Sequence, residues 1–160
     1  SYRQDAAQPT QYQVAKYIPN GDANLGIAPT ASNPELAGND WIILRFADVL
    51  LMHVEAILAG GQQTSATAAI NSFQRVRNRA GLTTPVTSIT KEDLLAERRV
   101  ELAFENHRFF DLVRFGAAQQ VLSAFSDANG YSFNATDLLL PIPQREINLS
   151  NGLMSQNPGY

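Results

Sequence analysis

A stretch of interleaved charged and apolar residues, 97–115, constrains the fold of this chain more than any other feature. Acids and arginines stand there among apolar residues at helical spacing, and Leu95, Leu102 and Phe109 recur every seven residues. Apolar positions wrap most of the helix circumference, so some of the charges must be buried or half-buried. A buried ion is tolerated when it is paired and hydrogen-bonded, and arginine–carboxylate pairs are the usual solution. The stretch therefore predicts helices joined by ion pairs.

The partners in these ion pairs follow from helical spacing. Glu101 and Glu105 are four residues apart, and so are Arg75 and Arg79, so each pair lies on one helix face. We expect pairing between the two faces. The residues predicted for this ion-pair framework are Arg75, Arg79, Arg98, Glu101, Glu105, Arg108, Asp111 and Arg114.

The same acids could suggest a glycosidase, because Glu97, Glu101 and Glu105 form one stripe. Glycosidases need two carboxylates on opposite sides of the scissile bond, whereas one stripe presents its carboxylates from the same side. We therefore interpret these acids as structural and predict that the protein is not an enzyme.

Composition narrows the function by exclusion. The chain has 160 residues, 44% of them hydrophobic, which is enough for one ordinary core. A net charge of -3 argues against nucleic acid as the main partner, because phosphate binding needs a clustered positive surface. Cysteine is absent, so no thiolate nucleophile or thiolate metal site is available. No apolar run is long enough to span a membrane, and no export signal is visible at the start.

Hydrophobic periodicity divides the chain into three predicted segments. Residues 1–40 are rich in Gln, Asn, Pro and Gly and predict loops with one extended piece at 12–18. Residues 41–126 predict a helical core, and residues 127–160 predict a coil-rich tail packed on the helices. The helices expected in the core cover 42–59, 64–80, 90–106, 107–115 and 117–126, and one further turn is expected near 144–148. The first of these is apolar on nearly all sides and is predicted to be buried.

Helix starts and stops can also be located. Thr90 and Asp93 have the spacing of a capping box, and Thr64 or Ser65 is the expected cap of the preceding helix. Asn106 marks the expected end of the helix that starts at Thr90, because Asn tolerates the left-handed conformation of a helix end.

No group of residues predicts a metal site or a catalytic site. His53 and His107 lie far apart in the sequence, and neither has a second metal ligand one helical turn away. Neither a nucleophile elbow nor a phosphate-binding loop is present. We predict no metal and no cofactor.

Aromatic side chains are the candidates for a ligand surface, because they offer flat apolar platforms for sugar rings. The predicted ligand-binding residues are Tyr12, Tyr17, Trp41 and Tyr131. Trp41 opens the apolar segment 41–56, which favours a position in the core over a ligand platform.

Four segments, in order, resemble the SusD/RagB family. The stretch that begins at Glu97 is similar to its ER..ELAFEG.R.FDL.RWG signature, and 41–56 (WIILRFADVLLMHVEA) is similar to its W..LR.ADVLLM.AEA helix. Residues 69–81 resemble the family's A.N.VR.RAG helix, and the tail carries LLPIP and QNPGY. Two positions depart from the pattern: Asn106 stands where the family usually has Gly, and Phe115 where it usually has Trp.

The resemblance implies an all-α fold of tetratricopeptide-like helical hairpins with substantial irregular coil. It implies a non-catalytic protein of the outer membrane and cell surface that binds glycans and passes them to a SusC-like TonB-dependent transporter. Family members are anchored by a lipid on an amino-terminal Cys, so this chain resembles a carboxy-terminal fragment without the anchor. Most family glycan contacts lie upstream of the segment that begins at Trp41, so no family ligand residue is carried over.

Two alternatives stay open at the level of sequence. The protein could be a peptide-binding nutrient receptor of the RagB type, which has the same fold. Alternatively, this region could be a scaffold that docks on the transporter, with the ligand site in the missing amino-terminal half. Neither composition nor motif distinguishes glycan from peptide.

Overall fold

The computed structural model describes residues 2–4, 12–14, 16 and 41–160. The chain divides into two compact units, Ser1–Phe46 and Ala47–Tyr160. In the first unit, β1 (Tyr2–Gln4) pairs antiparallel with β2 (Tyr12–Val14), with Tyr2 opposite Val14. The sequence predicted an extended piece that begins at Tyr12 but not its partner strand. The end of that predicted piece, Tyr17 and Ile18, lies outside the described residues.

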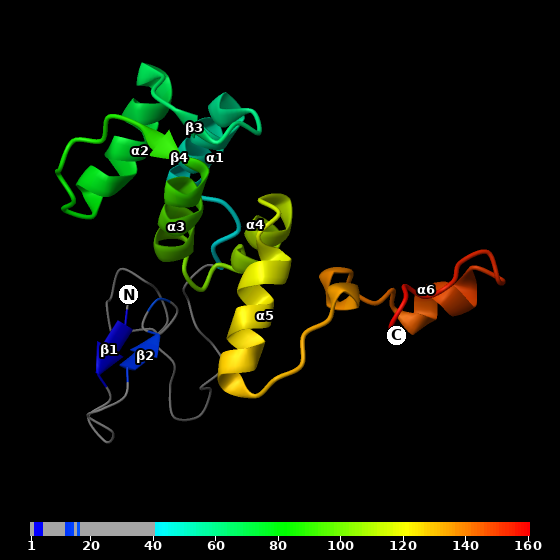
Figure 1. Cartoon of the computed structure of the whole chain (residues 1–160). Coiled ribbons are helices and arrows are strands. Elements are labelled where there is room, and N and C mark those ends of the chain that lie inside the picture. The colour runs from blue at the N-terminus through cyan, green and yellow to red at the C-terminus, as the bar shows by residue number, and fades with distance from the viewer. Residues whose placement is uncertain (1, 5–11, 15, 17–40) are drawn as a thin grey trace. The chain divides into compact units, whose positions relative to one another are not determined.

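The second unit is mostly helical, which confirms the predicted all-α class (Figure 1). Its elements are α1 (Phe46–Leu58), α2 (Thr67–Arg79), α3 (Lys91–Glu101), α4 (Arg108–Arg114), α5 (Ala118–Asn129), the 3₁₀ helix η2 (Ala135–Leu138) and α6 (Gln144–Leu149). A two-stranded ribbon that the sequence did not predict joins β3 (Gln63–Thr64) to β4 (Ile89–Thr90). This ribbon brings the chain before α2 next to the chain before α3.

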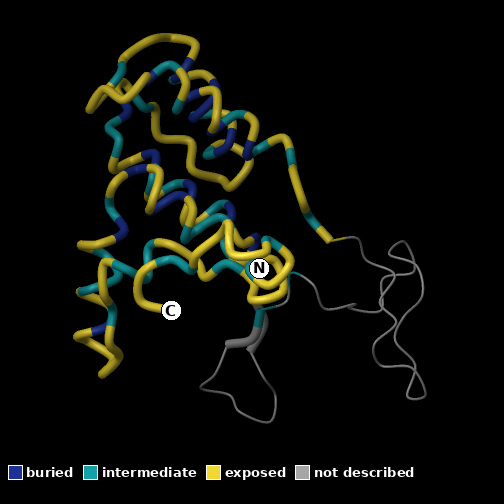
Figure 2. Tube along the Cα trace, turned by 90° about the vertical axis from the view of Figure 1, so that its right-hand side faces the viewer, coloured by how far each residue is buried: buried dark blue, intermediate teal, exposed yellow. Residues whose placement is uncertain are grey.

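The core of this unit lies where α1, α2 and α3 meet. Leu51 and Val54 of α1, Phe73 of α2, Ile89 of β4 and Leu94 of α3 are all buried there. In α1 the buried residues Leu51, Val54 and Leu58 recur every three or four positions, as a one-sided apolar face requires. Figure 2 shows the buried parts of the chain in dark blue, most of them along the helices.

The first predicted helix differs from the structure in extent and burial. α1 starts at Phe46 instead of residue 42, and Trp41 is 59% exposed, so the expectation that Trp41 fills the core is wrong. Val49 and Met52 are each 41% exposed, so the described residues bury only one face of α1. An apolar run reads the same in a helix and in an extended segment, which is why the pattern placed the start too early.

The helix ends agree with the sequence at one predicted cap and differ at the others. The Thr90 side chain and the Asp93 carboxylate form the predicted capping box. α3 ends at Glu101, earlier than predicted, and both Phe104 (φ 66°) and Asn106 (φ 63°) are left-handed. Before α2, Thr64 lies in β3 and its hydroxyl accepts a hydrogen bond from the N–H of Ala66, so neither predicted residue is the cap.

The tail closes on itself through its two proline-containing motifs. The Gln156 side chain accepts a hydrogen bond from the Ile142 N–H and donates one to the Ile142 carbonyl, both at 2.8 Å. The Asn157 side chain donates to the Leu140 carbonyl at 2.7 Å. Gly159 has φ 99°, and a Cβ on it would lie 3.0 Å from the Thr136 side chain, so a larger residue would be strained there. None of the residues 127–160 is buried, and packing of the whole tail on the helices stays a prediction.

Candidate functional site

A network of ion pairs joins the helices next to the candidate site. Arg98 of α3 donates to Asp48 of α1 at 2.8 Å and to Asp111 of α4 at 3.0 Å, and all three side chains are buried. Arg114 extends the ion-pair network, because it donates hydrogen bonds to Asp111 at 2.8 Å and to Glu55 of α1 at 2.6 Å. The pKa of Arg114 is raised, chiefly by its hydrogen bond to Glu55. Three helices are thereby fixed in register by charges that satisfy one another.

Two further ion pairs join α2 to α3. Arg79 donates to both oxygens of Glu101 at 2.8 Å, and Arg77 donates to Glu97 at 2.8 Å. The structure thus brings Arg79 and Glu101 together, as their spacing predicted. Arg77 was not in the predicted set, although it lies between Arg75 and Arg79 in the sequence. Glu105 is buried, whereas Arg75 is exposed on α2.

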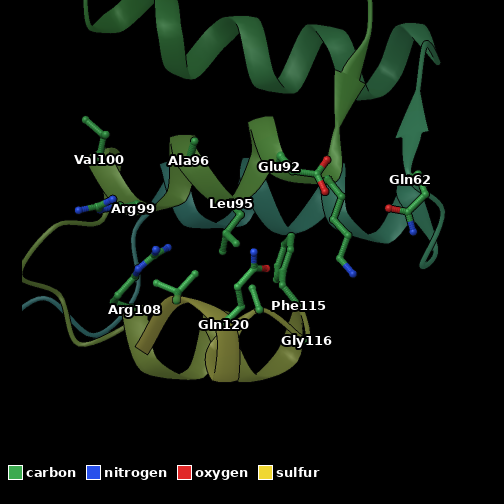
Figure 3. A pocket seen from close by; sticks show the side chains of 13 residues that line it. Gln62, Glu92, Leu95, Ala96, Arg99, Val100, Arg108, Phe115, Gly116 and Gln120 are labelled. Atoms are coloured by element: carbon green, nitrogen blue, oxygen red, sulfur yellow. The ribbon is translucent and has the colours of Figure 1, made fainter. Parts of the chain in front are cut away.

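A groove of about 550 Å³ opens between α3 and α5, with the start of α4 at one end (Figure 3). Its α3 wall includes Glu92, Leu95 and Arg99, and its opposite wall includes Arg108, Phe115 and Gln120. Gln62 and Lys91 complete one end, where the Lys91 ammonium lies 5.9 Å from the centre of the Phe115 ring. This volume is within the range of small-ligand sites. We call this feature the α3–α5 groove.

A smaller hollow of about 320 Å³ lies at the turn from α3 to α4, and we call it the corner pocket. Its lining includes Phe104, Asn106 and His107 from the turn, together with Arg99 and Arg108. Because Arg99 and Arg108 line both hollows, the corner pocket adjoins the α3–α5 groove. Phe104 is 60% exposed and is held at a positive φ, a conformation that costs a bulky residue about 1–3 kcal/mol.

Arg99 and Arg108 are the cations that these two hollows share. Among the described residues, neither forms an ion pair, in contrast to Arg98 and Arg114. The pKa of Arg108 is lowered by burial and by the positive charge of Arg99, while Asp111 opposes the shift. The structure therefore places Arg108 outside the ion-pair framework for which it was predicted, close to the positive charge of Arg99.

Among the aromatic residues predicted to bind ligand, the structure describes the side chains of Trp41 and Tyr131. Trp41 is exposed but does not line the groove, and Tyr131 is 67% exposed beyond the end of α5. The Tyr131 ring stacks on Phe125, with ring centres 6.2 Å apart. The backbone of Tyr12 lies in β2, and Tyr17 lies outside the described residues. Ligand binding by these four aromatic residues therefore stays a prediction.

The sequence did not single out Phe104, Arg99 or Gln120 as site residues. Phe104 was expected inside a helix that continued to residue 106, and only the early end of α3 exposes its ring. Arg99 had a usable signal, because a residue next to buried Arg98 must point about 100° away from it on a helix. No sequence signal marked Gln120 as a site residue, because exposed amide side chains are common on helices.

The described residues offer no metal centre. In that part of the chain, no group of three or more His, Cys, Asp or Glu side chains is placed to hold an ion. His53 donates to or accepts from the Ser72 hydroxyl at 2.9 Å, which joins α1 to α2. None of the helices described in the structure is both long and apolar enough to cross a membrane.

The comparisons with known proteins all point to the same family. A sequence model of the SusD family matches residues 3–160. The SusD-like protein P2 of Formosa agariphila is 29% identical over 157 residues, and the starch-binding protein SusD of Bacteroides thetaiotaomicron is 36% identical over 123 residues. These matches cover 92% and 74% of this chain but only 30% and 21% of the relatives.

A solved structure agrees with the sequence matches. A laminarin-binding SusD-like protein superposes with a TM-score of 0.69 at 37% identity, covering 96% of this chain and 30% of the other. The chain thus spans less than a third of the length of these relatives. The match extends over nearly all of the present sequence and includes both the helical unit and the tail, so this chain belongs to the SusD family.

Proposed function

We propose that this chain is part of a non-catalytic receptor that binds glycans at the cell surface. The observation that carries the proposal is the family match over residues 3–160, which includes similar proteins named for binding starch and laminarin. The α3–α5 groove supports it with a volume that suits a sugar unit and with amide side chains, Gln62 and Gln120, along its length. Two of the three acids that could suggest hydrolysis, Glu97 and Glu101, are instead bound to arginines of α2.

The wider setting that we propose follows the family resemblance. The receptor is held at the outer membrane by a lipid anchor. It captures glycan and passes it to a SusC-like TonB-dependent transporter, which imports it. This role needs binding and release but no bond cleavage, metal or cofactor.

Native affinity electrophoresis tests the binding step. The chain is run through gels that contain starch, laminarin, xylan, pectin or no polysaccharide, with an unrelated protein of similar charge as the mobility control. We expect retardation in at least one polysaccharide gel and none in the plain gel. Equal mobility in all gels would contradict glycan binding by this chain.

The peptide-binding alternative makes an opposite prediction in a parallel experiment. A mixed library of unstructured peptides would shift the amide chemical shifts of the groove residues, while every glycan would leave them unchanged. The scaffold alternative predicts that neither ligand class binds and that the chain is captured by a SusC-like transporter alone.

A further inference from the structure

The arginines of α3 and α4 fall into two classes. Arg98 and Arg114 are matched by carboxylates on neighbouring helices, whereas Arg99 and Arg108 are matched by none of the described residues. Asp111 is the nearby acid, and both of its oxygens already accept hydrogen bonds from Arg98 and Arg114. The positive charges of Arg99 and Arg108, at the shared end of the groove, are therefore not used by the ion-pair framework.

The two unmatched arginines converge on one place. Arg99 extends from α3 and Arg108 from the start of α4, and Figure 3 shows both guanidinium groups at the same end of the groove. Two like charges brought together repel each other, and the pKa of Arg108 is lowered partly for this reason. An anion between them would remove that repulsion. A carboxylate suits the position, because its two oxygens match the planar fork of a guanidinium.

The neighbouring side chains indicate what else the anion carries. Phe104 presents an exposed ring in the corner pocket, and Asn106 adds an amide on the same turn. Both residues are left-handed, so the turn holds them in place at an energetic cost instead of leaving them on a regular helix. An aromatic face binds the apolar side of a sugar ring, and amides bind hydroxyl groups.

We propose that the shared end of the α3–α5 groove and the corner pocket binds a uronate residue of an acidic glycan. The sugar carboxylate lies between Arg99 and Arg108, and its ring lies against Phe104. The rest of the glycan follows the groove toward Gln62 and Gln120. This inference rests on the proposed glycan binding and adds the substrate class.

Titration calorimetry with a galacturonate trimer, a neutral galactose trimer and inorganic sulfate tests the proposal. We expect the galacturonate trimer to bind, the neutral trimer to bind at least about tenfold more weakly, and binding of the acidic trimer to weaken as salt is added. Arg99→Gln and Arg108→Gln should each weaken acidic-trimer binding by about tenfold or more. Phe104→Ala should weaken the binding of both trimers.

Arg145→Gln is the matched control, since Arg145 is an exposed arginine on α6 that does not line the groove. Circular dichroism confirms that each variant is folded, and Arg108→Lys replaces Arg108→Gln if the latter is not. Equal binding of the two trimers would overturn acidic selectivity and leave the proposed glycan binding intact. Binding of sulfate as tight as that of the acidic trimer would also overturn the proposal, because the sugar would then contribute nothing. Binding of neither trimer, with polysaccharide retardation absent as well, would reject the proposed function itself.

Discussion

Arg98 is 3% exposed and donates to carboxylates on two other helices, so we expect its substitution to lower the free energy of unfolding strongly. Removing it leaves Asp48 without that guanidinium partner inside the protein, while Asp111 keeps Arg114. An unpaired buried charge costs far more than the net gain from forming the pair. Its neighbour Arg99 is exposed and makes no ion pair with the described residues, which provides an adjacent arginine for comparison.

Arg98→Met, which keeps much of the side-chain volume, should lower the free energy of unfolding by about 3–5 kcal/mol. Arg99→Met should change it by no more than about 0.5 kcal/mol. Urea denaturation followed by circular dichroism measures both. Equal stability of the two variants would show that the buried ion pairs do not hold the helices in register.

At this scale, the sequence predicted that charges would be buried but not which partners would meet. Arg79 and Glu101 were placed on facing stripes correctly, because spacing within a helix fixes which residues share a face. Arg98 and Asp48 are 50 residues apart in the sequence, so local sequence patterns cannot predict that they pair. Arg108 was wrongly assigned to the ion-pair framework, because the sequence does not show whether a given arginine forms an ion pair with an acid.

α3 is the element whose start is determined most clearly by its own sequence. The Thr90 hydroxyl and N–H both donate to the Asp93 carboxylate, and the Asp93 N–H donates back to the Thr90 hydroxyl. Thr90→Ala should lower the free energy of unfolding by about 1 kcal/mol. Thr87→Ala, in the exposed loop before β4, is the control and should change it by less than about 0.5 kcal/mol. Thermal and urea unfolding measure both, and equal effects would contradict a capping role.

The same box predicts a pH dependence. The bonds from Thr90 lower the pKa of Asp93 below its ordinary value of 3.8. Because the folded pKa lies below the unfolded one, the stabilisation is complete above 3.8 and is lost as pH falls through the folded pKa. The stability difference between wild type and Thr90→Ala should therefore be larger at neutral pH than at the acidic end of the folded range. A difference that is constant with pH would show that the ionised carboxylate plays no part.

Side-chain hydrogen bonds that resemble strand pairing hold the tail together. The Gln156 side chain accepts a hydrogen bond from the Ile142 N–H and donates one to the Ile142 carbonyl. Gln156→Met removes both bonds and keeps the side-chain length. Amide hydrogen exchange at Ile142 should then accelerate by about tenfold or more, while exchange in α3 should not change. Gln144→Met is the matched control, because that side chain bonds only to Asn148 within α6. Unchanged exchange at Ile142 would contradict closure of the tail by Gln156.

Most helices were predictable from periodicity, and the errors lie at their ends. The capping box at Thr90 was correct because its signal is local and chemical. The predicted start of α1 was wrong because 41–44 is apolar without being helical. The β3–β4 ribbon was missed because each strand has only two residues. η2 was missed as well, since a single 3₁₀ turn leaves no periodic pattern.

The helical unit as a whole combines an ion-paired helical framework with a positively charged groove. Ion pairs join α1, α3 and α4, and the α3–α5 groove holds Arg99 and Arg108, which that framework does not use. The framework sets the positions of α3 and α4, from which these two arginines extend, so both cations are brought together before an acidic sugar binds. The chain spans about 30% of the length of its relatives, so contributions from other regions to the bound glycan are compatible with this groove.

Amide chemical-shift mapping of the chain during titration with a galacturonate trimer reports both whether a glycan binds and where it binds. We predict saturable shifts that cluster at Arg99, Phe104, Asn106, Arg108 and Gln120, with α6 unaffected. Shifts confined to Tyr131 and its surroundings, or no saturable shifts at all, would contradict this prediction.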